Sequence, residues 1–202
     1  MWLRKPGRET KRWLAAFGIL AAVGAALAVS GCGAAYVEGN TASVLLLIES
    51  IGEGTPQLSD VRGENGAIVN CQIELTVSAR PKNPNGPVGI SEDVQLNRYT
   101  VTYRRADGRS VEGIDVPFAI SGNTSALVSS TGASQTQLFV DLVRHQAKLE
   151  PPLMNITGLQ VVTMFADISV FGASISGKSV SARGSAQVTF ADFADGTTTC
   201  EG

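Results

Sequence analysis

The chain has 202 residues, a formal net charge of −2, one histidine and three cysteines. A mildly acidic chain whose Lys and Arg residues form no cluster beyond the N-terminus is a poor candidate for nucleic-acid binding, because phosphate neutralisation supplies most non-specific affinity. A single histidine excludes a zinc site built from several imidazoles, and the absence of a CxxC pair leaves a thioredoxin-like role without support.

The first 31 residues have the parts of an export signal. Residues 1–12 carry five basic residues against a single Glu9, residues 13–29 carry no charge, and small residues follow. A basic region, an apolar region and a small-residue end are typical of a secretory signal, which is removed from the mature protein. The apolar run is slightly shorter than the roughly 20 residues of a transmembrane helix. We therefore predict a signal helix over residues 1–31.

This signal ends on Val29-Ser30-Gly31-Cys32. The order aliphatic, small, small, cysteine resembles the lipobox of bacterial prolipoproteins. The resemblance implies a diacylglyceryl group on the sulfur of Cys32, cleavage before this residue, and attachment to a membrane of the cell envelope. Gly33 stands where an aspartate favours inner-membrane retention in many Gram-negative bacteria, so in such a cell the outer membrane is favoured. An ordinary cleaved signal with a chance cysteine is the alternative.

Removing residues 1–31 from 202 leaves 171 residues, with 11 basic and 17 acidic side chains and a net charge of −6. This length suffices for one domain with a sizeable core. We predict a lipid-anchored tether over 32–42, a domain over 43–191 and a polar tail over 192–202. In an oxidising compartment Cys71 and Cys200 are predicted to form a disulfide, whose loop-closure entropy corresponds to about 4–5 kcal/mol. Two separate thiols are the alternative.

The mature chain shows short apolar or alternating segments separated by turn residues, a pattern typical of β-strands. Ser43–Ser50 is a short apolar run that predicts a strand buried on both faces. A phase change near Asn97-Arg98 predicts a β-bulge. Gly184 predicts a bend or a close approach. The predicted strands are Ser43–Ser50, Ala67–Ala79, Val94–Arg105, Val111–Ser121 (irregular or at an edge because of Pro117), Asn123–Ser130, Ala133–Val143, Leu159–Phe171 and Val180–Phe190.

Two regions leave alternatives or suggest function. Gln137–Leu149 also fits a helical stripe, so a short helix there competes with the strand. Gly52–Gly66 and Arg80–Asp93 have the glycine, proline and asparagine content of loops. Because long loops in compact domains are often functional, Arg80–Asp93 is a candidate contact surface.

Seven or eight strands without βαβ alternation predict an all-β fold, a single two-sheet antiparallel β-sandwich, with a β-barrel as the alternative. Tyr99-Thr100-Val101-Thr102-Tyr103-Arg104, closed by Asp107-Gly108, resembles the central strand of fibronectin type III and related immunoglobulin-like domains. The hairpin Val162–Phe190 resembles their last two strands. The sequence departs from the immunoglobulin pattern because both tryptophans lie in the signal and the Cys71–Cys200 spacing is too wide.

Catalytic and metal-binding chemistry is weakly represented. His145 is alone, and no serine has a plausible base and acid beside it, so we predict no enzyme activity and no cofactor. Scattered acids could hold Ca²⁺ only if the fold gathered them, and the better interpretation is solvated loops; these acids are Glu92, Asp93, Asp192, Asp195 and Glu201.

The sequence therefore predicts a lipid-anchored envelope protein whose non-catalytic sandwich acts as a structural or protein-interaction module. Its membrane partner is reached through Cys32, its protein partner is an unidentified envelope component, and no nucleic acid is involved. The Arg80–Asp93 loop or an edge strand is the expected contact surface. The alternative is an accessory protein for a small ligand or carbohydrate, with Tyr99 or Tyr103 lining a pocket, although core packing is the better interpretation of these tyrosines.

Overall fold

A computed structural model describes residues 40–86, 89–131 and 134–193. The predicted signal, Cys32, the first part of the tether and most of the C-terminal tail, with Cys200, lie outside these ranges. The described residues all belong to one compact unit of the chain. None of the helices among them has the length and apolar character that a membrane span requires.

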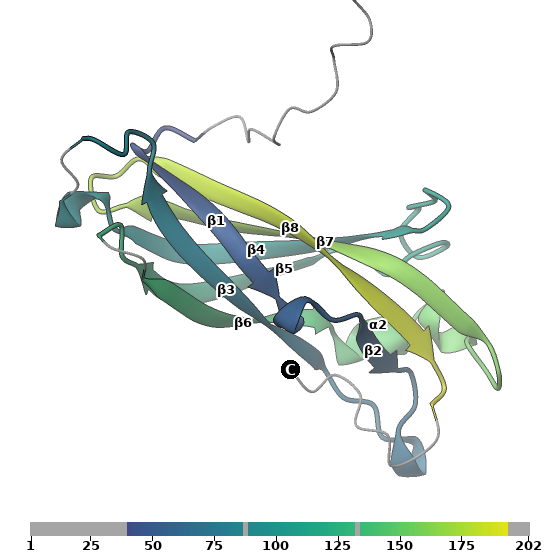
Figure 1. Cartoon of the computed structure of the whole chain (residues 1–202). Helices are drawn as coiled ribbons and strands as arrows, with labels where there is room; N and C mark the ends of the chain where they lie inside the picture. The colour runs from purple at the N-terminus through teal and green to yellow at the C-terminus, as the bar shows by residue number, and fades with distance from the viewer. Residues whose placement is uncertain (1–39, 87–88, 132–133, 194–202) are drawn as a thin grey trace, which may run out of the picture. The chain divides into compact units, whose positions relative to one another are not determined.

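Eight strands account for most of the described residues (Figure 1). They are β1 (Val44–Ile51), β2 (Gln57–Asp60), β3 (Cys71–Pro81), β4 (Val94–Arg105), β5 (Ile120–Val128), β6 (Gln135–Val143), β7 (Val161–Ser174) and β8 (Ser179–Ala191). The other elements are one short helix, α2 (His145–Lys148), and the 3₁₀ turns η1 (Gly52–Gly54), η2 (Glu64–Gly66), η3 (Ile90–Glu92) and η4 (Leu153–Asn155).

The strands form two sheets, as predicted. One sheet has the order β1-β3-β6, and the other, which curls into half of a barrel, has the order β2-β8-β7-β4-β5. All pairings are antiparallel except that of β2 with β8, which is parallel. The prediction of a wholly antiparallel fold is therefore wrong at β2, which lies inside the segment Gly52–Gly66 that was predicted to be only a loop.

A single hydrophobic core fills the space between the two sheets. Alternate residues of β3 (Cys71, Ile73, Leu75, Val77) and of β7 (Met164, Ala166, Ile168, Val170) are fully buried in it, because successive side chains of a strand point to opposite faces. Two tyrosines of β4 also connect the two sheets through hydrogen bonds to β6. The Tyr103 hydroxyl donates to the Leu142 carbonyl oxygen at 2.5 Å, and the Tyr99 hydroxyl accepts from the Asp141 backbone N–H at 3.2 Å.

Tyr103 offers a test of this core. Burial raises the pKa of Tyr103 above its ordinary value near 10, so the folded state keeps the neutral phenol. Stability that depends on this group is present below pH 10 and is lost as the pH rises above it. We expect Tyr103→Phe to cost about 1–2 kcal/mol at neutral pH, because the Leu142 carbonyl loses its buried partner. The variant is also expected to lose less stability than wild type above pH 10, as measured by urea unfolding at several pH values. An unchanged midpoint at neutral pH would contradict the buried hydrogen bond.

Several strand predictions can now be assessed. β4 has the predicted bounds, and the predicted bulge is confirmed by a register shift between Leu96 and Arg98 against both neighbouring strands. The prediction that the first strand is buried on both faces is wrong, because Leu45 and Glu49 of β1 are exposed on the outer face of the three-stranded sheet. The helix considered for Gln137–Leu149 is wrong as well. Residues 135–143 pair with β3, and only a single helical turn follows, at α2.

The strand predicted over Val111–Ser121 is wrong for most of its length, because the connection from β4 to β5 contains no strand before Ile120, and Pro117 lacks the N–H that a strand ladder requires. After the turn at Gly108, which has a φ of +88°, residues 111–119 form only one isolated bridge, between Glu112 and Val116. This segment presents Val111, Ile114 and Phe118 to solvent at the end of the domain where β4 finishes.

Candidate functional site

The edges of the two sheets meet along β8, which contacts different N-terminal segments at its two ends. At its start, the backbone N–H groups of Thr41 and Ala42 donate to the Ser179 carbonyl oxygen at 3.0 and 3.3 Å. At its end, β2 pairs with residues 188–191, and the Val61 N–H donates to the Ala191 carbonyl oxygen at 3.0 Å. The chain therefore covers this edge of β8 at both ends.

Between these covered ends, β8 has an open edge. From Ala182 to Gln187, β7 is the only strand within the described ranges that forms a ladder with β8. The carbonyls of Ser179 and Ala191 point away from β7, and the β7–β8 register has no shift between them. Since backbone groups alternate sides along a strand, the N–H and C=O groups of Arg183 and Ser185 also face away from β7, toward the open side.

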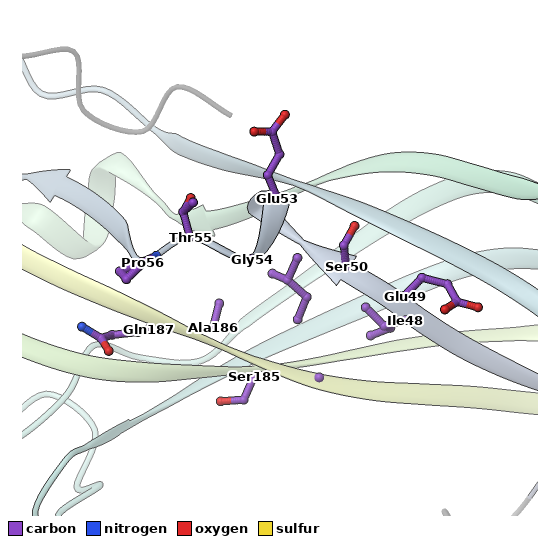
Figure 2. A pocket seen from close by; sticks show the side chains of 12 residues that line it. Ile48, Glu49, Ser50, Glu53, Gly54, Thr55, Pro56, Ser185, Ala186 and Gln187 are labelled. Atoms are coloured by element: carbon purple, nitrogen blue, oxygen red, sulfur yellow. The ribbon is translucent and has the colours of Figure 1, made fainter.

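A groove of about 600 Å³ lies along this open edge (Figure 2). Its other wall consists of the last half of β1, η1 and the residues that lead into β2, so that the groove separates the two sheets where β1 diverges from β8. The lining residues are Ile48, Glu49, Ser50, Ile51, Glu53, Gly54, Thr55, Pro56, Gly184, Ser185, Ala186 and Gln187.

The floor of the groove is apolar and depends on Gly184. A Cβ atom at position 184 would lie 2.6 Å from Cδ1 of Ile51 and 3.4 Å from Cδ1 of Ile48. The predicted close approach at this glycine is therefore confirmed, and its partners are two isoleucines of β1. The groove thus has a floor of Ile48, Ile51 and Ala186 beside the unpaired backbone of β8.

Two glutamates give the groove an acidic rim. Glu49 accepts hydrogen bonds from the Ser78 hydroxyl at 2.5 Å and from the Arg80 guanidinium at 2.9 Å, and these two bonds hold the pKa of Glu49 below its ordinary value. Glu53 is exposed, has a φ of +56° and forms no ion pair with any residue of the described segments. Its carboxylate is directed away from the groove floor in Figure 2. A cationic side chain of a ligand at the rim of the groove can therefore form an ion pair with the Glu53 carboxylate.

A second, shallow recess of about 610 Å³ lies on the outer face of the five-stranded sheet, among residues of β4, β7 and β8. Two phenylalanines lie on this face, but arginines cover their rings. The Arg98 guanidinium is 4.4 Å from the ring centroid of Phe171, and that of Arg104 is 4.6 Å from the centroid of Phe165. Arg104 also pairs with Asp167 at 2.9 Å. The aromatic faces that a sugar would stack on are therefore occupied by guanidinium groups.

The structure does not bring together the residues that the sequence suggested for a ligand site. Tyr99 and Tyr103 are buried in the core, so the prediction that they line a ligand pocket is wrong and the core interpretation is confirmed. His145 is exposed at the start of α2, where its backbone N–H donates to the Asn70 side-chain oxygen at 2.7 Å.

The acids considered for Ca²⁺ also lie apart. Glu92 and Asp93 precede β4, where the Asp93 carbonyl oxygen accepts from the Ile175 N–H of the β7–β8 turn, whereas Asp192 follows the far end of β8. Asp195 and Glu201 lie outside the described residues. Asp93 is buried and accepts from the backbone N–H and hydroxyl of Ser130 at 2.7 and 2.9 Å. Within residues 40–86, 89–131 and 134–193, no three His, Cys, Asp or Glu side chains are grouped as metal ligands.

Cys71 is fully buried on the core face of β3. Its predicted partner Cys200 and the predicted lipidation site Cys32 lie outside the described residues, so the disulfide and the lipid stay predictions. The predicted contact loop, Arg80–Asp93, lies beside the first described residues: Lys82 donates from its backbone N–H to the Ser43 carbonyl at 2.9 Å.

Comparison with known proteins gives no further information. No family model, no curated protein and no solved structure matches the chain. The groove along β8 was not predicted, and the only sequence signal for it was Gly184, an isolated glycine in an alternating strand.

Proposed function

We propose that this chain is a bacterial cell-envelope lipoprotein, anchored through a lipid on Cys32, whose β-domain has no catalytic role and binds an extended segment of a partner protein along β8. The lipobox sequence supports the anchor. The observation that carries the binding function is the groove in which the backbone groups of Arg183 and Ser185 have no strand partner among the described residues.

Strand addition explains how such a groove binds. A guest strand gains main-chain hydrogen bonds from an open edge, and alternate side chains of the guest supply specificity. The covered ends of β8 limit the guest to the stretch from Ala182 to Gln187. Above Gly184 and Ala186 the groove suits a small or apolar side chain, and a basic side chain fits the rim beside Glu53. The expected guest is therefore a short extended segment with alternating small and basic residues.

An immunoglobulin-like or fibronectin type III-like relation is part of the proposal. It is supported by the place of β4 inside the five-stranded sheet, between β7 and β5, by its bulge and following turn, and by the closing hairpin of β7 and β8. The parallel pairing of β2 with β8 adds a feature that this resemblance does not imply.

The alternative function, binding of a small ligand or carbohydrate, would use the recess on the outer face of the five-stranded sheet. Exposed aromatic rings beside convergent acids would favour that function. The rings of Phe165 and Phe171 instead carry arginines, and Asp167 is paired with Arg104. A filled core with an open strand edge favours protein contact, so we retain strand addition as the proposed function.

Replacing Ser185 by proline tests this proposal. The substitution removes the N–H that faces the groove, and proline is tolerated where an edge N–H faces solvent. Short random peptides selected on the mature protein provide the probe. We expect Ser185→Pro to weaken their binding about tenfold or more, since one main-chain hydrogen bond and the fit of the guest backbone are lost. Bound peptide is also expected to slow hydrogen exchange at the Arg183 and Ser185 amides of the wild type.

The matched control is Ser185→Ala, which keeps the backbone N–H and is expected to bind the peptides as wild type does. Thermal unfolding of both variants checks that the fold is intact. Peptides that bind a folded Ser185→Pro protein with wild-type affinity, or that leave the two amides unprotected, would refute strand addition at β8.

A further inference from the structure

Two exposed isoleucines lie together at one end of the domain. Ile90 is 74 % exposed in η3, and Ile175 is 56 % exposed in the β7–β8 turn. Backbone hydrogen bonds join these two segments: the Ile175 N–H donates to the Asp93 carbonyl oxygen and the Ser176 N–H to the Ser91 carbonyl oxygen, both at 2.9 Å. The two apolar side chains are therefore presented on one joined surface, which we call the isoleucine end.

The chain enters the domain at the isoleucine end. The Asn40 carbonyl oxygen accepts from the Lys82 ammonium at 3.0 Å, and the Ser43 hydroxyl donates to the carboxylate of Glu92, which belongs to η3 with Ile90. Cys32 precedes Asn40 by eight residues, and an extended chain spans at most about 3.4 Å per residue, so the anchor lies within about 27 Å of Asn40.

The charges at this end do not oppose a membrane. Lys82 and Lys178 are the basic residues near the two isoleucines. Of the neighbouring acids, Asp93 is buried against Ser130, and Glu92 accepts from Ser43. Two lysines and two carboxylates sum to no net charge here, whereas the mature chain carries a net charge of −6.

We propose that the isoleucine end rests on the lipid surface, with the side chains of Ile90 and Ile175 in the interfacial layer. This inference rests on the lipid anchor proposed for Cys32. The short tether keeps this end at a high effective concentration near the bilayer, and transfer of exposed apolar side chains out of water is favourable. β4 runs about 36 Å from Asp93 toward the opposite end of the domain. The apolar residues beyond it, Ile114 among them, consequently face away from the membrane.

The mature protein offers a direct reporter because the two tryptophans of the full chain, Trp2 and Trp13, both precede the predicted cleavage site. A tryptophan introduced at position 90 or 175 is then the only one in the processed protein. The experiment uses the purified lipoprotein in phosphatidylcholine vesicles whose acyl chains carry bromine, a quencher of tryptophan fluorescence. We expect the emission of Ile90→Trp and of Ile175→Trp to shift to shorter wavelength and to lose intensity. The matched control, Ile114→Trp, starts from an isoleucine that is 72 % exposed at the opposite end, and is expected to show neither change.

A second variant separates contact by the native surface from the affinity of tryptophan for membranes. Adding Ile175→Asp to Ile90→Trp is expected to reduce the quenching. Unquenched Ile90→Trp, or equal quenching of Ile90→Trp and Ile114→Trp, in a protein shown by mass spectrometry to carry the lipid would overturn this inference alone. A protein without an acyl chain on Cys32 would overturn both the anchor and the inference.

Discussion

Replacing Cys32 by serine is expected to abolish fatty-acid incorporation and to shift the protein out of the membrane fraction. Attachment of the diacylglyceryl group requires the cysteine sulfur, and each buried CH₂ of the lipid contributes about 0.8 kcal/mol to membrane binding. A domain with a net charge of −6 gains no electrostatic help at an anionic surface. The measurement is metabolic labelling with an alkyne fatty acid, followed by fractionation of the cells.

Cys200→Ser is the matched control: it also replaces one cysteine by serine, and although it opens the predicted Cys71–Cys200 disulfide, it leaves the sulfur of Cys32 in place and is expected to keep the label and the membrane location. Label in neither the wild type nor the control would mean that the N-terminal segment is an ordinary signal. In that case the protein would have no lipid anchor, and the proposed location and envelope partner would be wrong.

Replacing Gly172 by alanine is expected to destabilise the domain by about 3 kcal/mol. Gly172 pairs with Leu96 beside the bulge of β4, and a Cβ atom there would lie 2.4 Å from the Gln95 carbonyl oxygen and 3.0 Å from the Leu96 Cα. Both atoms belong to the backbone of the neighbouring strand, which can move away only if the β4–β7 ladder is distorted. The measurement is thermal unfolding followed by circular dichroism, with an expected fall in Tm of roughly 10 °C.

Gly89→Ala provides the comparison. Gly89 has a φ of −124°, and the nearest atom to a Cβ there is the Ser91 hydroxyl oxygen at 3.8 Å, an ordinary contact. Its effect is expected to stay within about 0.5 kcal/mol. Equal stability of the two variants would show that β4 and β7 do not approach as closely at the bulge as described.

The features that the sequence predicted correctly are those encoded within one strand. The change of phase between Leu96 and Tyr99 places a bulge in β4 because the period of two must be restored for both halves to face the core. Similarly, the alternation in β3 identifies its buried face without knowledge of its partners. The apolar run of β1 was interpreted as doubly buried because composition alone does not show that Leu45 lies on the outer face of a sheet.

The features that the sequence did not predict depend on contacts between distant segments. β2 has only four residues, and it is held by pairing with a strand about 130 positions later. The groove exists because β1 and β8 diverge between two places where the N-terminal region covers β8, and no local pattern records such a divergence. For the same reason, Gly184 indicated a close approach but not that Ile48 and Ile51 were the partners.

The pairing of β8 with N-terminal segments has a consequence for the order of folding. Thr41, Ala42 and β2 are made before β3 to β7, whereas β8 (Ser179–Ala191) is made after all the other described strands. Contacts between residues so far apart in the sequence have a large entropic cost of loop closure, so they form slowly. During synthesis the N-terminal segments therefore remain without their partner until β8 emerges. The described domain is therefore completed only when β8, the last of its strands in chain order, has been made.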